Sequence, residues 1–229
     1  MAELITDANP LNGTPGPDTL IYFKVDDPIG DNFLPSSYLE QVYINGFDGN
    51  DLISDVSFSY DIINGGAGND TIYGYSNFDV IQGDDVDGVA GNDYLYGGED
   101  TDGLFGVGGN DTLIGGTGKD TLDGGAGNDV FGFDSVSDSQ PGLLRDIIQD
   151  FVGNGNLPGD RIDLSRIDAN STKGGDQAFT YIGTRTFSAA GQIRYSGGIL
   201  QGNTDSNLSA NFEIQLAGSP LLVASDIIA

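Results

Sequence analysis

Aspartate recurs at a fixed nine-residue spacing in the middle of this 229-residue chain, among glycines that also keep fixed places. Five copies of the unit follow one another from Gly88 to Gly132, and they read GVAGNDYLY, GGEDTDGLF, GVGGNDTLI, GGTGKDTLD and GGAGNDVFG. Each copy has glycine first, aspartate sixth and an apolar residue eighth. Glycine-rich backbone can turn sharply and direct carbonyl oxygens toward the neighbouring carboxylate. Such a set of oxygen atoms suits a hard cation.

The spacing also predicts the elements that position these aspartates. Six residues of each unit form a turn and the last three form a short strand, whose eighth residue faces inward. These inward residues are Leu95, Leu104, Leu113, Leu122 and Phe131. Two units complete one coil, and coils stack at the ~4.8 Å separation of paired strands. Aspartates one coil apart therefore lie above one another.

Two ladders of aspartates result when two insertions are allowed for. The first ladder comprises Asp51, Asp70, Asp93, Asp111 and Asp129, and the second comprises Asp61, Asp79, Asp102, Asp120 and Asp138. Stacked carboxylates ~5 Å apart repel by roughly 1–3 kcal/mol. One inward apolar residue per unit does too little to offset the ordering entropy of a glycine-rich chain. Calcium tolerates irregular oxygen cages, whereas magnesium demands a tight octahedron. We therefore expect the repeats to be disordered without calcium.

The two ladders differ in quality. Every rung of the first carries the sequence G-N-D, whereas the second begins with the glycine-poor stretches SFSYD and YSNFD. Asp100 also stands where glycine is expected, which requires a left-handed conformation at some energetic cost. A metal-free turn held by stacking alone is therefore the alternative for the Asp61 and Asp79 end of the second ladder.

Composition excludes several classes of function. The chain has 8 basic and 35 acidic residues, a net charge of −27, which disfavours nucleic acid and anionic membranes as partners. Cysteine and histidine are absent, so disulfides, thiolate nucleophiles and histidine-ligated zinc are excluded. No apolar run approaches the ~18 residues of a membrane span. The opening sequence MAELITDANP has no signal-peptide features, so we expect no cleaved leader.

The predicted fold is all-β: a calcium-bound parallel β-roll followed by a small antiparallel β cap. Residues 1–45 form an N-terminal cap with an insert that includes a short helix near Ser37–Val42. Residues 46–141 form the roll, with a one-residue slip at Asp55 and a five-residue insert at 83–87. Residues 142–229 alternate apolar and polar positions, typical of short strands, and cover the last apolar face of the solenoid. Leu143–Phe151 is expected to be helical.

The repeats resemble those of the RTX hemolysins, lipases and metalloproteases. Residues 124–229 are also similar to the C-terminal domain of the serralysin proteases, through GGAGNDVFGFDSVSDS, RDIIQDF, GDRIDLS and the final DIIA. This resemblance implies several calcium ions between turns, bound by position-6 carboxylates and by carbonyls at positions such as 1 and 3. The implied ligands are Gly46, Asp48, Asp51, Gly65, Ala67, Asp70, Asp79, Gly88, Ala90, Asp93, Gly97, Glu99, Asp102, Gly106, Gly108, Asp111, Gly115, Thr117, Asp120, Gly124, Ala126, Asp129 and Asp138.

The same resemblance implies secretion to the outside of the cell by a type I secretion apparatus. That apparatus reads an uncleaved C-terminal signal, which Asp226-Ile227-Ile228 matches, although Ala229 replaces a bulky last residue. The zinc motif H-E-x-x-H of the proteases is absent, and so is the G-x-S-x-G elbow of lipases. A hydrolase that uses two carboxylates stays open by residue type, but a metal role already accounts for most aspartates. We expect no enzyme.

The ninth position of the unit carries Tyr73, Tyr96 and Ile114 on one outer face. They predict either a ladder for an extracellular carbohydrate or protein ligand, or ordinary cross-strand pairing, which we favour. The predicted function is a secreted calcium-binding RTX β-roll that folds on calcium after export and serves as an extracellular binding or structural module. The alternative is a non-catalytic C-terminal RTX module of a larger secreted protease, lipase or polysaccharide-modifying enzyme.

Overall fold

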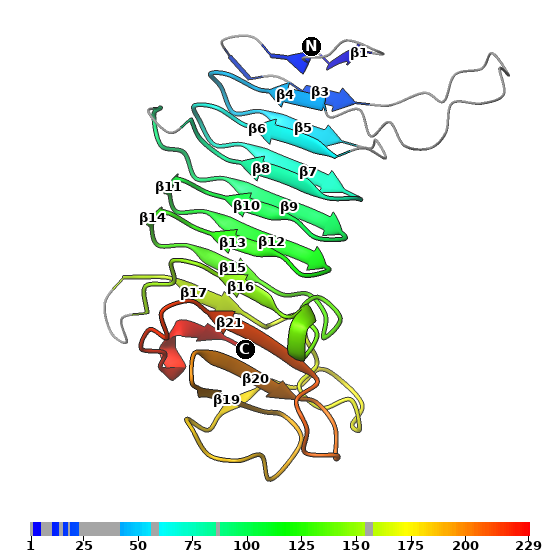
Figure 1. The fold of residues 1–229 in the computed structure, drawn as a ribbon, viewed down its shortest axis with the longest axis vertical. Helices are drawn as coiled ribbons and strands as arrows, with labels where there is room; N and C mark the ends of the chain where they lie inside the picture. The colour runs from blue at the N-terminus through cyan, green and yellow to red at the C-terminus, as the bar shows by residue number, and fades with distance from the viewer. Residues whose placement is uncertain are drawn as a thin grey trace, which may run out of the picture.

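The strands of this protein stack one above another along a single axis, from the N-terminus to the C-terminal part (Figure 1). The structure is a computed structural model, and it describes residues 2–5, 11–13, 16–17, 19–22, 42–55, 60–85, 88–153 and 158–229. The chain passes alternately through two sheets, so that consecutive strands of the roll belong to opposite sheets. This arrangement is the predicted parallel β-solenoid.

The first sheet has nine strands, all of them in parallel pairs. In spatial order they are β1 (Ala2–Ile5), β3 (Thr19–Tyr22), β5 (Leu52–Asp55), β7 (Thr71–Tyr75), β9 (Tyr94–Glu99), β12 (Thr112–Thr117), β15 (Val130–Gly132), β17 (Arg161–Asp163) and β22 (Ile227–Ile228).

The second sheet has eleven strands and contains the antiparallel part of the fold. In spatial order they are β2 (Leu11–Asn12), β4 (Val42–Asn45), β6 (Asp61–Asn64), β8 (Asp79–Gln82), β10 (Gly103–Phe105), β13 (Thr121–Asp123), β16 (Asp146–Ile148), β21 (Phe212–Leu216), β20 (Ile199–Asn203), β19 (Gln192–Ser196) and β18 (Thr180–Tyr181). A two-stranded ladder of β11 (Gly108–Gly109) and β14 (Ala126–Gly127) joins turns on the outside.

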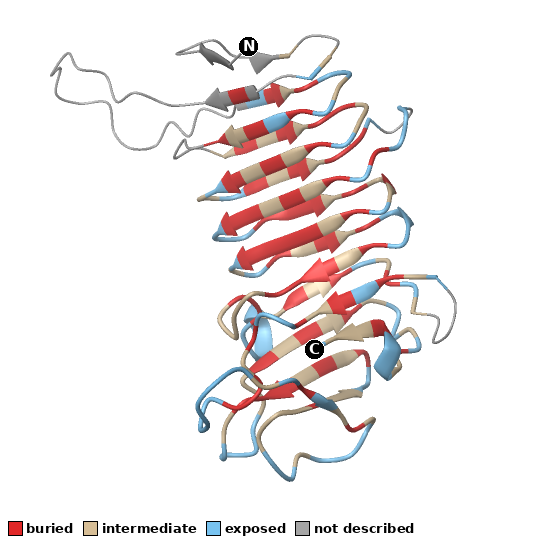
Figure 2. Ribbon diagram, turned by 180° about the vertical axis from the view of Figure 1, so that it is seen from behind, coloured by how far each residue is buried: buried red, intermediate tan, exposed pale blue. Residues whose placement is uncertain are grey.

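The core of the roll consists of two columns of apolar side chains, one from each sheet. Leu95 pairs in register with Leu113, which pairs with Phe131, and all three are fully buried. The opposite column includes Ile81, Leu104 and Leu122, equally buried. Figure 2 shows these buried positions recurring along the stack, alternating with partly exposed ones. The inward eighth position of the unit is therefore confirmed.

The turns need glycine at particular positions for conformational reasons. At Gly109 the backbone has φ +116°, and a Cβ there would collide with the Gly91 carbonyl of the preceding turn. Asp100 takes the left-handed conformation expected of it, with φ 78°. Val107 does the same with φ 75°, a strained conformation for a β-branched residue.

The C-terminal part continues both sheets and then closes the open end of the roll. Strands β16 and β17 extend the two parallel sheets, and β19, β20 and β21 pair antiparallel beyond them. Phe179 packs edge-on against Phe212 in the core of this part. The fold class expected from the sequence is thus confirmed, including the antiparallel strands.

Two helices expected from the sequence fare differently. The prediction of a helix at Leu143–Phe151 is wrong: a short 3-10 helix, η1 (Gly142–Leu144), is followed by strand β16. Asp146 and Ile148 face inward there while Ile147 is only partly buried, so the segment follows the period of a strand.

A second 3-10 helix, η2 (Ala224–Asp226), precedes β22. The helix expected near Ser37–Val42 lies outside the described residues, except for Val42, which begins β4. Among the described residues, no helix is long and apolar enough to cross a membrane.

Candidate calcium centre

The first aspartate ladder forms as predicted. The backbone N–H of Asp51 donates to Oδ1 of Asp70, Asp70 donates to Asp93, Asp93 to Asp111, and Asp111 to Asp129, each at 2.8 Å. Each bond therefore joins a turn to the next turn along the chain. The ladder also continues one rung further than predicted, because the Asp129 N–H donates to Oδ1 of Asp160 at 3.0 Å.

The second ladder forms in the same way, with one correction. The N–H of Asp61 donates to Oδ1 of Asp79 at 3.1 Å, and the bonds continue from Asp79 to Asp102 and from Asp102 to Asp120 at 2.8 Å. The next rung is Asp146 at 2.8 Å, and the placement of Asp138 in the ladder is wrong.

Asp138 is held inside its own turn. Its Oδ2 accepts from the N–H groups of Asp134 and Ser135 at 2.7 and 2.9 Å. The sequence contains the reason, because Asp138 is followed by Ser139 and Gln140, with no apolar eighth residue to enter the core. Asp146 is followed by Ile147 and the buried Ile148.

In eight of the ladder residues the second carboxylate oxygen has no hydrogen-bond donor within the described part of the chain. This holds for Oδ2 of Asp70, Asp79, Asp93, Asp102, Asp111, Asp120, Asp129 and Asp146, each 3% exposed or less. A buried oxygen that accepts nothing costs roughly 1–3 kcal/mol, and more when it is charged. Asp160 differs, since its Oδ2 accepts from the Val152 N–H at 2.7 Å. These eight oxygens therefore require a partner that the described part of the chain does not supply.

Beside all of these oxygens except that of Asp146 lies a glycine, which has no side chain to crowd the oxygen. At Gly74 a Cβ would lie 2.6 Å from Asp79 Oδ2 and 2.7 Å from the Gly97 carbonyl of the next turn. At Gly106 a Cβ would crowd Asp111 Oδ2 and lie 2.6 Å from the Gly124 carbonyl. We call these residues the slot glycines: Gly46, Gly65, Gly74, Gly83, Gly97, Gly106, Gly115 and Gly124, each facing an aspartate Oδ2.

The slot glycines include every predicted first-position residue except Gly88, and their ligation of a metal stays a prediction. Gly88 is exposed and adjoins Asp85, whereas Gly83 faces Asp93 Oδ2. The five-residue insert therefore falls after the first position of this turn and not before it. The insert also buries Asp84, whose Oδ1 and Oδ2 accept from the Gly91 N–H at 2.9 and 3.1 Å. Asp84 was not foreseen from the sequence.

The third-position residues stack on the outer side of the turns. Asp48 bridges Ala67, Gly108 pairs with Ala126, and Glu99 pairs with Thr117, all in parallel register. The side chains of Asp48, Glu99 and Thr117 are exposed, as are those of Ala90 and Ala126. The carboxylates of Asp48 and Glu99 therefore lie at the surface, and ligation through the backbone carbonyls of these positions stays a prediction.

Electrostatics in the ladders favour a bound cation. Burial, reinforced by Asp102, Asp55 and Asp61, raises the pKa of Asp79 to about 9. Burial and neighbouring carboxylates likewise raise the pKa of Asp93 to about 8 and that of Asp111 to about 7, against backbone hydrogen bonds that lower both. A divalent cation among these oxygens removes the penalty on the charged form. Orphan oxygens, open slots and raised pKa values together fit calcium ligation between turns.

Asparagines form a further ladder that sequence reasoning did not foresee. Oδ1 of Asn50 accepts from the Asn69 N–H at 2.9 Å. In the same way, Oδ1 of Asn69 accepts from the Asn92 N–H, Oδ1 of Asn92 from the Asn110 N–H, and Oδ1 of Asn110 from the Asn128 N–H. Here the later turn donates to the earlier one, the reverse of the aspartate ladder. The second face has Tyr60, Phe78, Thr101 and Lys119 in the corresponding position. The G-N-D sequence of the first face thus has a structural cause.

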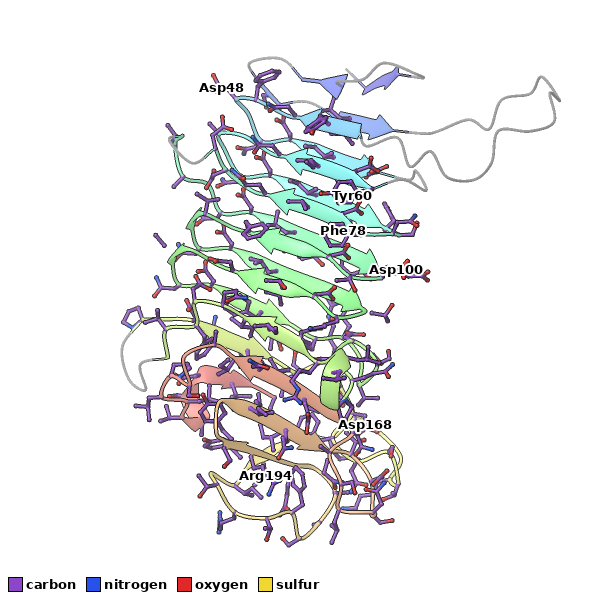
Figure 3. The ribbon with its side chains drawn as sticks, viewed as in Figure 1. Asp48, Tyr60, Phe78, Asp100, Asp168 and Arg194 are labelled. Atoms are coloured by element: carbon purple, nitrogen blue, oxygen red, sulfur yellow. The ribbon has the colours of Figure 1, made fainter. Side chains whose placement is uncertain are left out.

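The outer aromatic residues resolve into two arrangements. The rings of Tyr73 and Tyr96 lie 6.1 Å apart at an angle of 51°, and Ile114 is only 5% exposed, which is the geometry of cross-strand packing. Tyr60 and Phe78 instead stack flat, 5.0 Å apart at 14°. Figure 3 places Tyr60, Phe78 and Asp100 in succession along one side of the stack, opposite the turn of Asp48.

The repeats match a known protein family. The model of the RTX calcium-binding nonapeptide repeat matches four copies, over residues 59–81, 81–113 and 105–139. Among solved structures, the AlgE6R3 subunit of the Azotobacter vinelandii mannuronan C5-epimerase is 27% identical over 70% of this chain and 78% of its own, with a TM-score of 0.36. No curated protein matches the chain. The likeness of residues 124–229 to the serralysin C-terminal domain stays a prediction. Residues 59–139 are thus a run of RTX calcium-binding nonapeptide repeats.

Proposed function

We propose that this protein is a secreted module that folds when calcium binds between its turns outside the cell. The observation that carries the proposal is the set of buried Oδ2 atoms without donors among the described residues, seven of which face a slot glycine. Metal-free, the folded chain would hold two columns of desolvated carboxylates, which the unfolded chain leaves in water. Calcium binding then supplies folding free energy, because the sites exist only in the folded chain.

A calcium titration followed by far-UV circular dichroism tests this proposal. In excess chelator we expect little β signal, and in millimolar calcium a cooperative rise to the full β signal. Magnesium at the same concentration is the control and should give a much smaller rise, because it keeps its waters and demands octahedral geometry. A full β signal in chelator, unchanged by calcium, contradicts the proposal.

Export through the C-terminus is the second part of the proposal. Low calcium inside the cell keeps the repeats unfolded for passage through a type I channel, and higher calcium outside folds them. The support is the sequence Asp226-Ile227-Ile228, which spans the end of η2 and strand β22. Deleting residues 226–229 should reduce secretion from a host with that apparatus and leave calcium-induced folding intact. Undiminished secretion after deletion of 170–229 contradicts this part.

The module is proposed to act by binding and not by catalysis. The support is that the buried carboxylates of the repeats serve the two ladders or accept backbone hydrogen bonds. Each turn of the ladder bonds only to its neighbouring turns. The same arrangement could therefore belong to a free-standing protein or to a module of a larger enzyme. Incubation of the calcium-loaded chain with protein, ester and polysaccharide substrates should show no turnover above that of the chelator-treated chain.

A carbohydrate is the extracellular ligand that one observation favours. The flat Tyr60–Phe78 pair lies beside Asn77, Asp100 and Thr101 in a shallow hollow, and Phe78 is 41% exposed. Flat exposed rings next to polar groups suit the two-faced character of a sugar ring. The charge of −27 favours a neutral sugar. Binding to a neutral glycan array should be lost in Phe78→Ala and kept in Tyr94→Ala. Equal binding by both variants contradicts this assignment.

A further inference from the structure

Asp55 occupies a position that eight other turns give to glycine. In β5 the side chain of Ile53 is buried, that of Ser54 is partly exposed, and that of Asp55 is buried again, at 1% exposure. Each slot glycine likewise stands two residues after the buried apolar residue of its strand. Ser54 pairs with Tyr73, so Asp55 adjoins the slot glycine Gly74 in the neighbouring strand. The carboxylate of Asp55 therefore projects into space that glycine leaves open elsewhere.

Two ladder aspartates meet Asp55 at this place. One carboxylate oxygen from each of Asp55, Asp61 and Asp79 lies within 4.8 Å of the other two. None of the three residues is more than 1% exposed. Oδ1 of Asp79 accepts from the Asp61 N–H, and Oδ2 of Asp79 has no donor in the described part of the chain. The cluster thus has both a geometry for ligation and an oxygen that needs a ligand.

The chemistry of this cluster compensates for a defect in the repeats. The stretch YSNFD that ends at Asp79 lacks the interior glycines of the other turns, which shape the carbonyl ligands of a cage. A third carboxylate supplies oxygen atoms where those carbonyls are missing. Calcium accepts carboxylates in one- or two-oxygen coordination and tolerates irregular geometry, whereas magnesium does not.

We propose that Asp55, Asp61 and Asp79 bind a calcium ion that closes the N-terminal end of the second ladder. This site differs from the other turns because three side-chain carboxylates hold the ion. The inference rests on the proposed calcium-dependent folding and adds a site at the end of the ladder where the sequence favours a metal-free turn. It makes the slip residue Asp55 a ligand.

Counting calcium per chain tests the site. Equilibrium dialysis followed by elemental analysis should find one ion fewer in Asp55→Asn and in Asp55→Gly than in the unmodified protein. Asp55→Asn keeps the shape of the side chain, and Asp55→Gly recreates the slot of the other turns, so both should reach the full β signal in calcium. Asp176→Asn removes the same charge from an exposed position and should keep every ion.

Two results are distinguishable by this experiment. If the unmodified protein binds no calcium, the proposed function fails. If it binds calcium and both Asp55 variants bind the same number of ions, the inference alone is overturned. Crystals of the unmodified chain grown in calcium give an independent readout. An anomalous peak among the carboxylates of Asp55, Asp61 and Asp79 supports the site, and peaks at the other turns without one there overturn it.

Discussion

At the scale of single residues, the hydrogen bonding of Oδ2 decides whether a buried aspartate of this chain is able to bind a metal. Asp146 and Asp138 are both buried and both belong to the same short stretch of chain. Oδ2 of Asp146 has no donor among the described residues, whereas Oδ2 of Asp138 accepts two backbone N–H groups. Only the first arrangement leaves an oxygen for a metal.

The two residues should therefore respond differently to the same change. Asp146→Asn removes a ligand charge at the end of the second ladder, so we expect the calcium concentration at the folding midpoint to rise at least about tenfold, as for loss of groups that support metal ligands. Asp138→Asn keeps one acceptor oxygen for the turn and should shift the midpoint by much less. Circular dichroism in a calcium series measures both, and equal shifts would return Asp138 to the ladder.

The slot glycines give a second test at this scale. Gly106→Ala places a methyl group against Asp111 Oδ2 and the Gly124 carbonyl oxygen, and so displaces oxygens of the proposed site. We expect one turn to lose its ion and the folding midpoint to move to higher calcium. Gly103→Ala is the matched control, because its methyl group would meet only the Phe105 ring at 3.3 Å. If Gly103→Ala raises the folding midpoint as much as Gly106→Ala does, the slot glycines are required for packing and not for ligation.

At the scale of elements, the first face has two ladders of opposite hydrogen-bond direction and the second face has one. Asn110 accepts from the Asn128 N–H at 3.0 Å and donates its own N–H to Asn92 at 2.6 Å. Asn110→Ala should lower the free energy of unfolding in saturating calcium by about 1 kcal/mol, a typical net value for a lost hydrogen bond. Lys119→Ala, at the same position on the second face, should be neutral. Urea unfolding of the calcium-loaded variants measures the difference.

The elements that the sequence predicts best are those fixed by the period of nine. The inward column from Ile53 to Phe131 and the first ladder follow directly from spacing, because one misplaced residue would turn every side chain of a strand to the other face. The misplaced residues all lie beside insertions. Counting in steps of nine residues predicts Gly88 as a first position and Asp138 as a sixth position. The short pattern of aspartate, any residue and apolar residue instead marks the actual rungs, Asp146-Ile147-Ile148 and Asp160-Arg161-Ile162.

Other features carry no signal that counting could use. Asp84 lies in the insert, and it is buried where its carboxylate accepts from the Gly91 N–H. Asp55 breaks the period, and only its place in β5 turns its carboxylate inward. The asparagine ladder was visible as a repeated letter, but its bonds depend on the exact offset between stacked turns. Long-range register, which insertions change, decides these cases.

At the scale of the whole molecule, protons and calcium compete for the same oxygens. The pKa values of Asp70, Asp102 and Asp120 rise to about 6, 8 and 7, first of all through burial. A carboxyl group whose pKa is higher in the folded chain than its value of 3.8 favours folding below that lower value and ceases to do so as the pH rises through the folded pKa. The calcium-free chain should therefore gain β signal as the pH falls from about 9 toward 4.

In the presence of calcium the pH dependence should have the opposite sense. Protons displace the ion from the ladder, so the calcium midpoint should rise as the pH falls through the range of about 9 to 6. Titrations at several pH values by circular dichroism give the slope. Asp111→Asn, which removes one of the titrating groups, should have a shallower dependence. A midpoint that is independent of pH would show that the carboxylates do not take up protons in the folded chain.

Insertions of different lengths leave both ladders in register, and this has a consequence for the size of the molecule. The bonds from Asp70 to Asp93 and from Asp120 to Asp146 span 23 and 26 residues, yet each crosses one turn, like the 18-residue bond from Asp93 to Asp111. The length of the rod is therefore set by the number of aspartates in each ladder and not by the number of residues in the chain. Removing residues 106–123 should join Asp93 to Asp129 and Asp102 to Asp146. The product should be a rod shorter by one turn, about 4.8 Å, that still folds on calcium. Small-angle scattering can measure that difference. Deletion or duplication of a coil therefore changes the length of such a chain in steps of one coil.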